Sequence, residues 1–186
     1  MRQNEMETPL ALQGYLMNHA ARIAEEYDKR IIGWDEVLTV HPNFTPITAV
    51  WRDAAYVKDA VARNSKVILC PTQRGTYLDH KHLDEPSEPG RLGVSTVKDV
   101  YSLNIYHDLT VDERSYVLGG QGNLWTEEVK YGRQAEYMSF PRLSALAENL
   151  WLPCAHKKWS RFTKSLQPHL QRLERMGAQP YRGALE

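Results

Sequence analysis

The stretch KVILCP, residues 66–71, is apolar almost throughout and is predicted to be a β-strand. Continuous apolar runs that do not alternate with polar residues are typical of parallel strands covered on both faces. Three further segments contain such a run: KRIIGWDEVL (29–38), PITAVWRD (46–53) and YVLGGQGNLW (116–125). Because segments with helical periodicity separate these strands, the sequence predicts an α/β fold of four parallel βα units.

Apolar residues at three- and four-residue steps predict the helices. The first helix is expected over residues 8–28, with Thr8 as its N-cap and Pro9 in its first turn. Asp53 is predicted to cap the next helix, and Gly177 to end the last one. The side chains predicted to face inward are Leu12, Leu16, Ala20, Ile23 and Tyr27; Val57, Ala60 and Val61; Val97, Val100, Tyr101 and Ile105; Leu143, Leu146, Ala147 and Leu150; and Trp159, Phe162, Leu166, Leu170, Leu173 and Met176.

The length of the chain limits the kind of α/β fold. A complete (β/α)8 barrel typically needs about 250 residues, whereas this chain has 186. Four βα units therefore predict either a small doubly wound sheet or half of a barrel. The chain, residues 1–186, is expected to form one partial domain, with βα units over about 8–152 and a C-terminal helix and tail over 153–186. The segment LDEPSEPGRLG (83–93) is predicted to be a surface loop.

Composition and charge exclude several classes of function. The chain is 42% hydrophobic and 25% charged, which is typical of a soluble globular protein. Its formal net charge is zero, whereas binding to nucleic acids or anionic membranes calls for an excess of basic residues. No apolar run approaches the ~20 residues of a membrane span, and the first residues lack the apolar segment of a signal peptide. Neither a membrane nor a nucleic acid is therefore an expected partner, and the compartment is left open.

Aromatic and acidic residues gather at the predicted C-terminal ends of the strands, where parallel α/β proteins carry their active sites. Three of these ends have a tryptophan and the fourth has a tyrosine, each near a carboxylate. An indole stacks on the C–H face of a sugar, and nearby carboxylates accept hydrogen bonds from its hydroxyl groups. The pattern therefore predicts a carbohydrate pocket. Its residues are Trp34, Asp35 and Glu36; Trp51 and Asp53; Tyr77 and Asp79; and Trp125 and Glu127.

Several motifs closely resemble, in this order, the second half of the catalytic domain of family 20 glycoside hydrolases, the β-N-acetylhexosaminidases. They are GWDE (33–36), VW (50–51), TYLD (76–79), VLGGQGNLWTE (117–127) and FPRLSALAENLW (140–151). The resemblance runs from about residue 8 to the end of the chain. It implies a (β/α)8 barrel fold, in which the four strands are the fifth to eighth. Members of the family are often periplasmic, secreted or lysosomal.

The resemblance implies a reaction and a role for each matching residue. In this family a carboxylic acid protonates the glycosidic oxygen, while the substrate's own 2-acetamido oxygen attacks the anomeric carbon to give an oxazolinium intermediate, with retention. Tyr77 is implied to hold the acetamido oxygen for this attack. Asp79 and Glu127 are implied to accept hydrogen bonds from the O4 and O6 hydroxyls. The implied pocket wall consists of Trp34, Trp51 and Trp125.

The catalytic Asp-Glu pair of the family is missing. In the family it follows a His-x-Gly-Gly pattern ahead of the helix that matches residues 8–28, and no such pattern occurs in the chain. Asp35 and Glu36 match the fifth-strand motif instead, so they are predicted not to be catalytic. The chain is expected to hydrolyse nothing by itself. Arg142 and Glu148 are interpreted as structural, and no cofactor or metal is expected.

Three functions stay open on the sequence. The first is a portion of a hexosaminidase that acts on terminal N-acetyl-β-hexosaminides when it is completed. Its open edge strands would then be covered by a complementary half-barrel chain, by a second copy, or by the rest of a longer protein of which this chain is a fragment. The second is a non-catalytic carbohydrate-binding or assembly module derived from that family. The third is a different barrel glycosidase with Glu36 as its acid.

The remaining motifs have plain interpretations. His80 and His82 lack a third ligand at suitable spacing, so they are predicted to lie in a polar loop. The segment GGQG (119–122) lacks the Lys-Ser/Thr of a phosphate-binding loop and is predicted to allow close backbone packing. Cys70 lies in an apolar run and is predicted to be a buried thiol.

Overall fold

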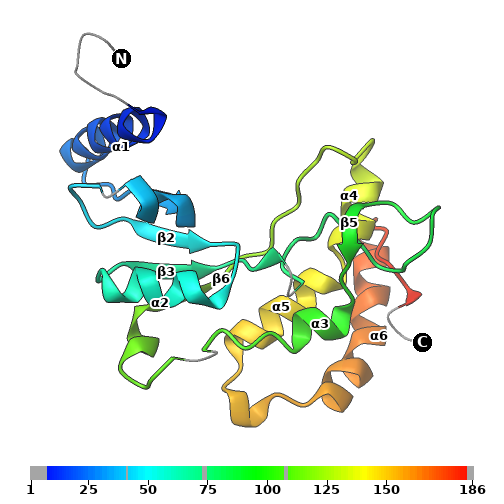
Figure 1. Ribbon diagram of the computed structural model, residues 1–186. Coiled ribbons are helices and arrows are strands. Elements are labelled where there is room, and N and C mark those ends of the chain that lie inside the picture. The colour runs from blue at the N-terminus through cyan, green and yellow to red at the C-terminus, as the bar shows by residue number, and fades with distance from the viewer. Residues whose placement is uncertain (1–7, 41, 73–74, 107–108, 184–186) are drawn as a thin grey trace. The chain divides into compact units, whose positions relative to one another are not determined.

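The structure, a computed structural model, describes residues 8–183 except 41, 73–74 and 107–108 (Figure 1). The chain divides into two compact units. The first unit lies within Met1–Leu69 and Tyr106–Gly119, and the second within Cys70–Ile105 and Gly120–Glu186. The predicted site residues are therefore distributed over both units.

A four-stranded parallel sheet with the order β1, β2, β3, β6 forms the first unit's framework. In register, Ile32 lies opposite Ile47, which lies opposite Lys66. Val50 and Val67 are almost completely buried, as expected for strands covered on both faces. The predicted parallel strands are confirmed, but each is shorter than its apolar run: β1 (Ile32–Trp34), β2 (Ile47–Val50), β3 (Lys66–Leu69) and β6 (Val117–Gly120).

Both α-helices of the first unit, α1 (Pro9–Glu26) and α2 (Ala54–Ala62), begin as predicted. The Ala11 amide donates a hydrogen bond to Thr8 Oγ1 at 3.1 Å, and the Ala55 amide donates to Asp53 Oδ1 at 2.7 Å. These side chains satisfy amide groups that have no partner inside their helices. Two 3-10 helices complete the unit, η2 (Asp35–Val40) directly after β1 and η4 (Glu113–Tyr116) directly before β6.

The two helices differ in what they bury. The predicted inner face of α2 packs on β2 and β3, where Val57, Ala60 and Val61 are buried (Figure 1). The predicted inner face of α1 is wrong, because Leu16 and Ile23 are 56% and 45% exposed. Within the described residues β1 pairs only with β2, so no strand on its other side is present for α1 to cover.

In the second unit, two short strands adjoin the segment predicted to be a surface loop. The strands β4 (His80–Lys81) and β5 (Arg91–Val94) pair in parallel, with His80 opposite Arg91. The Ser95 amide donates to the Lys81 carbonyl oxygen at 2.9 Å. The loop prediction is therefore wrong for the end of residues 83–93. Strands this short give no readable alternation of apolar and polar residues.

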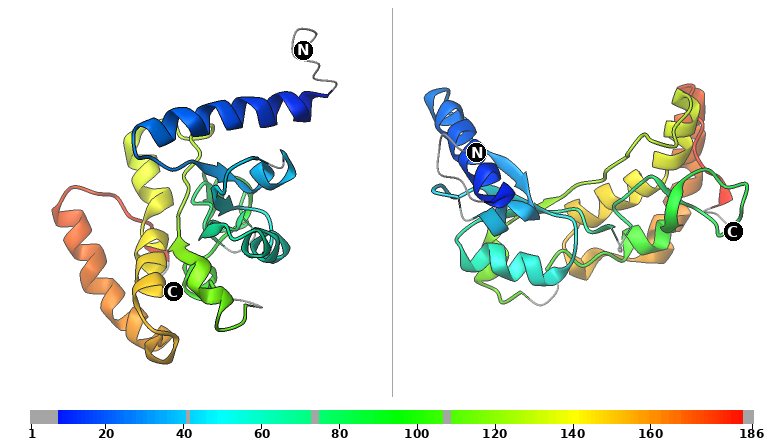
Figure 2. Two further views of the ribbon diagram at one scale, coloured as in Figure 1. Left: turned by 90° about the vertical axis from the view of Figure 1, so that its left-hand side faces the viewer. Right: turned by 45° about the horizontal axis from the view of Figure 1, so that its top comes forward.

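The second unit also contains α-helices, among which α3 (Val97–Tyr101) packs on α5 (Arg142–Trp151) (Figure 2). The predicted inner faces of α3 and of the middle of α6 are buried, but Met176 is 82% exposed just beyond the helix end. Gly177 has φ +92°, and the Ala178 amide donates to the Leu173 carbonyl oxygen, which confirms the predicted C-terminal cap. The helices are α3 (Val97–Tyr101), α4 (Gly132–Ser139), α5 (Arg142–Trp151), η5 (Cys154–His156) and α6 (Trp159–Arg175).

Helix α5 buries a face that only partly matches the predicted one, since Leu146 is buried as predicted but Leu143 and Ala147 are exposed. Leu143 is 37% exposed, whereas Arg142 and Asn149 are buried. Asn149 Nδ2 donates to the carbonyl oxygens of Tyr101 and Leu103, which lie at and beyond the end of α3. The apolar pattern missed Arg142 and Asn149 because these polar side chains are buried to satisfy backbone carbonyl groups, which apolar periodicity does not register.

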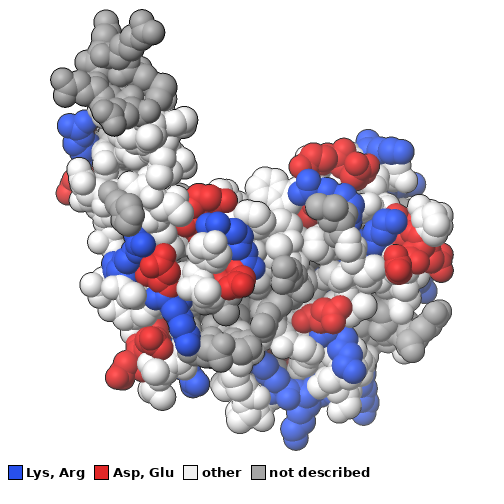
Figure 3. Space-filling view, in the orientation of Figure 1, with Lys and Arg blue, Asp and Glu red and all other residues white. Residues whose placement is uncertain are grey.

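Charge is distributed evenly in sign. Basic and acidic side chains both occur across the face shown in Figure 3, in keeping with a formal net charge of zero. This face therefore has no surface of a single charge sign.

Within the residues that the structure describes, no helix is both long enough and apolar enough to cross a membrane.

Candidate functional site

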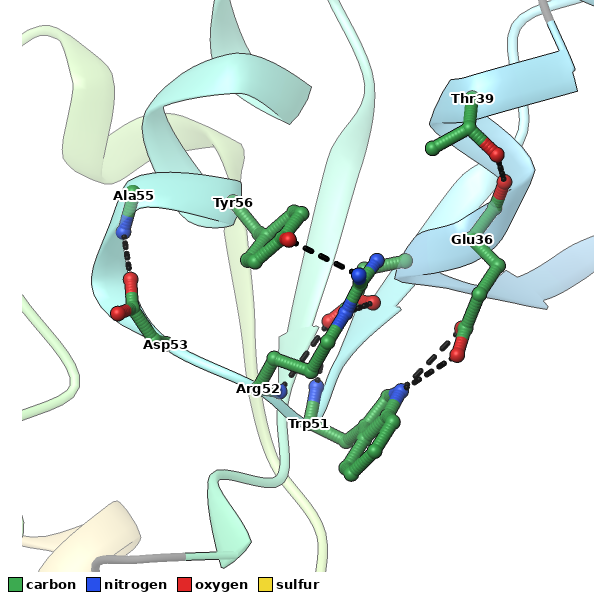
Figure 4. Close-up of polar contacts among 8 residues, drawn as sticks. Glu36, Thr39, Trp51, Arg52, Asp53, Ala55 and Tyr56 are labelled. Carbon is green, nitrogen blue, oxygen red and sulfur yellow. Dashed lines mark hydrogen bonds and ion pairs between the residues drawn. The ribbon is translucent and has the colours of Figure 1, made fainter.

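In the first unit, both oxygens of the Asp35 carboxylate accept hydrogen bonds from neighbouring residues. The side chain is fully buried at the end of β1. Its Oδ2 accepts hydrogen bonds from the backbone amides of Trp51 and Arg52 at 3.0 and 3.2 Å, and its Oδ1 accepts a short one from Arg52 Nε (Figure 4). These bonds tie the residues after β2 to the end of β1. Asp35 therefore has a structural role in this unit.

The neighbouring carboxylate of Glu36 is occupied by an indole. Trp51 Nε1 donates to Glu36 Oε1 and Oε2 at 3.1 and 3.2 Å, so that the indole points at the carboxylate (Figure 4). Trp51 is partly exposed, and Trp34, at the end of β1, is 37% exposed. The two tryptophans thus keep part of their surface available to a ligand, whereas Asp35 and Glu36 are engaged within the protein.

Arg52 completes this arrangement. Its guanidinium lies 3.8 Å from the centroid of the Tyr56 ring, and Nη1 donates to the Tyr56 hydroxyl at 2.9 Å. Burial lowers the pKa of Arg52, but the hydrogen bond and charge of Asp35 outweigh it, so the pKa is raised. Asp53 takes no part in this cluster, because its side chain caps α2.

In the second unit, backbone pairing brings Tyr77 beside Trp125. The Leu78 amide donates to the Asn123 carbonyl oxygen at 2.7 Å, and the Asn123 amide donates to the Thr76 carbonyl oxygen at 2.8 Å. The ring centroids of Tyr77 and Trp125 are 6.2 Å apart and their planes are 57° apart. Tyr77 is 8% and Trp125 36% exposed. Two motifs distant in sequence thus form one aromatic surface.

Arg91 joins the two predicted hydroxyl-binding carboxylates of this unit. Arg91 Nε donates to Asp79 Oδ2 at 2.6 Å, and Arg91 Nη1 donates to Glu127 Oε1 at 2.9 Å. The hydrogen bond to Asp79 raises the pKa of Arg91. Asp79 is 1% exposed, and its second oxygen, Oδ1, has no hydrogen-bond partner within the described residues. This buried oxygen is available to a donor from a ligand.

Arg142 holds the backbone on both sides of Asp79. Its guanidinium is fully buried and donates to the carbonyl oxygens of Leu78 and His80, as well as to those of Met138 and Ser95. Burial lowers the pKa of Arg142 to about 10, so the side chain is still positively charged at neutral pH. The structural interpretation of Arg142 is thus confirmed.

The prediction that His80 and His82 lie in a polar loop was wrong, because His80 lies in β4 and His82, which directly follows β4, is buried against an aromatic ring. His82 is 2% exposed and stacks on Tyr181 with a centroid distance of 4.0 Å. Its Nε2 lies 3.0 Å from the Tyr137 carbonyl oxygen, so the neutral ring donates from Nε2. Burial and the nearby Arg142 lower its pKa to about 3. Within the described residues, no group of three or more histidine, cysteine, aspartate or glutamate side chains is arranged to hold a metal ion.

Close packing involves only part of the GGQG segment. A side chain at Gly122 would lie 3.2 Å from Leu143 and 3.3 Å from Leu78, whereas one at Gly119 would meet nothing within 4 Å. Cys70 is buried, as predicted.

The predicted site residues therefore form one group in each unit. Trp34 and Trp51 belong to the first, and Tyr77, Asp79, Trp125 and Glu127 to the second. Sequence reasoning missed Arg52 and Arg91. Arg52 directly follows a predicted site tryptophan, which was a usable signal, but Arg91 was hidden in a segment read as a loop.

Comparison with known proteins identifies the family. The model of "Glycosyl hydrolase family 20, catalytic domain" matches residues 1–154. A beta-hexosaminidase of Porphyromonas gingivalis is 35% identical over 181 residues, which cover 95% of this chain and 23% of the relative. A beta-hexosaminidase of Vibrio furnissii is 32% identical over 143 residues, covering 73% of this chain and 23% of the relative.

Solved structures of this family have the same fold. The exo beta-N-acetylglucosaminidase from Vibrio harveyi, in complex with N-acetylglucosamine, matches with a TM-score of 0.88 and 28% identity over 98% of this chain and 29% of its own. The beta-N-acetylhexosaminidase from Streptomyces coelicolor matches with a TM-score of 0.82 and 26% identity over 95% of this chain and 37% of its own. The chain spans about a quarter of the length of the curated relatives named above. Because the family model covers most of the chain and one relative is more than 30% identical over nearly all of it, the chain belongs to glycosyl hydrolase family 20 and comprises part of that family's catalytic domain.

Proposed function

We propose that the chain is the sugar-contacting part of a β-N-acetylhexosaminidase that hydrolyses terminal N-acetyl-β-hexosaminides. The observation that carries this proposal is the second-unit cluster, in which the Tyr77 and Trp125 rings lie near each other and Arg91 binds the carboxylates of Asp79 and Glu127, two residues further along each motif. An aromatic surface next to fixed acceptors suits a sugar ring with its hydroxyl groups.

The proposed roles follow from the chemistry of substrate-assisted hydrolysis. The Tyr77 hydroxyl donates a hydrogen bond to the 2-acetamido oxygen and holds it for attack on the anomeric carbon. Asp79 and Glu127 accept hydrogen bonds from the O4 and O6 hydroxyls. Within the second unit, the partly exposed Trp125 ring contacts an apolar part of the sugar. The partly exposed rings of Trp34 and Trp51 in the first unit are likewise each suited to contact a sugar.

The general acid and the acetamide-orienting aspartate are proposed to come from outside this chain. No His-x-Gly-Gly-Asp-Glu motif occurs in the sequence. Asp35 is buried against Arg52, and the Glu36 carboxylate binds the Trp51 indole, which leaves neither well placed to protonate a glycosidic oxygen. We propose that a complementary half-barrel chain supplies the acid and covers the exposed face of α1.

The experiment is an assay with a chromogenic N-acetyl-β-glucosaminide. The purified chain is measured alone and after mixing with a fragment that carries the first half of a family 20 catalytic domain, including the Asp-Glu pair. Activity is expected only in the mixture. Tyr77→Phe should lower that activity by about 100-fold, because it removes the hydrogen bond that positions the nucleophile.

Glu36→Gln provides the matched control. It keeps the shape of the side chain and one acceptor for the Trp51 indole, so the activity of the mixture should change by less than about threefold. Activity of the chain alone that Glu36→Gln abolishes would instead establish Glu36 as the acid of a different glycosidase. Sugar binding without activity in any mixture would favour a non-catalytic carbohydrate-binding module.

A further inference from the structure

The carboxylate of Asp79 is unusual because only one of its oxygens is satisfied. Oδ2 accepts from Arg91 Nε at 2.6 Å, whereas the buried Oδ1 has no partner within the described residues. A buried carboxylate oxygen without a donor lowers the stability of the folded chain. Such an oxygen persists most readily where a ligand provides the missing donor.

Arg91 is bound to the Asp79 segment through its backbone as well as its side chain. The Arg91 amide donates to the Asp79 carbonyl oxygen at 2.9 Å, at the start of the pairing between β4 and β5. The guanidinium then reaches Asp79 with Nε and Glu127 with Nη1. The planar guanidinium of Arg91 therefore holds the carboxylates of Asp79 and Glu127, which come from different segments, in one geometry.

Gly90 is required for this approach. Its φ is +130°, and a Cβ at this position would lie 2.8 Å from the Asp79 carbonyl oxygen and 2.9 Å from the Lys81 amide nitrogen. Real Cβ atoms do not approach backbone so closely, so only glycine allows the chain to run against residues 79–81. The dipeptide Gly90-Arg91 is thus built to bring a guanidinium to Asp79.

We propose that Arg91, whose approach to Asp79 requires glycine at position 90, is a positioning residue that fixes Asp79 and Glu127 as a pair of acceptors for sugar hydroxyl groups. The proposal rests on the function proposed above and adds to it the residue that sets hydroxyl recognition. One planar cation hydrogen-bonded to two carboxylates limits the rotation of both. Asp79 Oδ1 and the second oxygen of Glu127 are then left to accept from the ligand.

A purely structural ion pair would have a different signature. Glu127 is 56% exposed at its side chain and Arg91 32%, so their interaction is screened by water and contributes little to folding. The pair with Asp79 differs because the Asp79 carboxylate is buried, so loss of Arg91 should lower the unfolding midpoint as well as weaken ligand recognition. The loss of binding should also depend on whether the ligand carries the hydroxyl groups that the two carboxylates bind.

The test pairs changes in the protein with changes in the sugar. The full chain is titrated with N-acetylglucosamine and with its 4,6-dideoxy analogue, and tryptophan fluorescence reports binding. Arg91→Gln should weaken binding of N-acetylglucosamine by about 10- to 100-fold and binding of the analogue by less than about twofold. Arg91→Lys should fall between, because an ammonium ion cannot bridge two carboxylates in the same plane.

Two further variants distinguish the position of the Arg91 guanidinium from the mere loss of a positive charge. Gly90→Ala should reproduce the sugar dependence of Arg91→Gln, because it displaces the arginine without removing it. Arg182→Gln removes an arginine from an exposed ion pair with Glu174 in the same unit and should leave both affinities unchanged. Unfolding midpoints of all variants establish that each is folded.

The outcomes are distinguishable. Equal weakening of both sugars by Arg91→Gln would show a merely structural role and overturn the proposal while leaving the proposed function intact. Unchanged binding of both would overturn it as well. If the unaltered chain binds neither sugar, the proposed function of this cluster fails, and the role of Arg91 in hydroxyl recognition fails with it.

Discussion

The carboxylates of the two units are organised in opposite ways. In the first unit, both oxygens of Asp35 and both of Glu36 accept hydrogen bonds from the protein. In the second, Asp79 has an unpartnered buried oxygen and Glu127 is largely exposed. Two adjacent acidic residues in the sequence are therefore a poor guide to a ligand-binding site. Carboxylates with unused hydrogen-bonding capacity are the better candidates for ligand binding.

The largest expected effect comes from Arg142, which supports the segment that carries Asp79. Arg142→Met would leave the carbonyl oxygens of Leu78, His80, Met138 and Ser95 without this donor. We expect the free energy of unfolding to fall by about 5 kcal/mol in urea titrations followed by circular dichroism. Arg161→Met, which breaks an ion pair on the surface of α6, should cost less than about 1 kcal/mol. Equal losses would contradict the role of Arg142.

An intermediate loss of unfolding free energy is expected when the two buried aspartates, Asp35 and Asp79, are each replaced by asparagine. Asp35→Asn must place an amide –NH2 either against Arg52 Nε or against two backbone amides, so a donor meets donors, and we expect a loss of about 3 kcal/mol. Asp79→Asn can keep its oxygen on Arg91 and put its –NH2 where Oδ1 has no partner. Its loss should be about 1 kcal/mol or less. Urea unfolding of both variants tests this, and similar losses would mean that the two carboxylates are equally engaged.

An effect smaller than that of Asp35→Asn concerns the pH dependence of the second unit. The pKa of His82 is lowered to about 3 from the usual 6.5, so the unfolded chain takes up a proton before the folded chain does as the pH falls. Stability from neutral His82 is complete above about pH 6.5 and is lost progressively towards pH 3. Between pH 7.5 and 5 this loss should be about 2 kcal/mol. Urea unfolding at both pH values should show it in the unaltered chain but not in His82→Gln, and an identical loss in the two would refute it.

The sequence predicted the fold well where local signals were strong. The parallel strands, the caps at Thr8 and Asp53 and the glycine end of α6 were all recognisable, because apolar runs and capping residues act over a few neighbouring positions. The buried face of α1 was predicted wrongly, and that of α5 was predicted correctly only at Leu146 among its four residues. Amphipathic periodicity names an apolar face, but whether that face is covered depends on which other segments are present.

The family, the α/β class and the identity of the aromatic and acidic residues at the strand ends could be read from the amino-acid sequence alone, since these follow from motifs and periodicity. Only the tertiary structure decided which carboxylates are engaged. It showed that Arg52 saturates Asp35, that Arg91 leaves one oxygen of Asp79 unpartnered, and that Arg142 holds the backbone on both sides of Asp79. The physical reason is that a hydrogen bond depends on positions within a few ångströms, and residues far apart in sequence reach such positions only when the chain is folded.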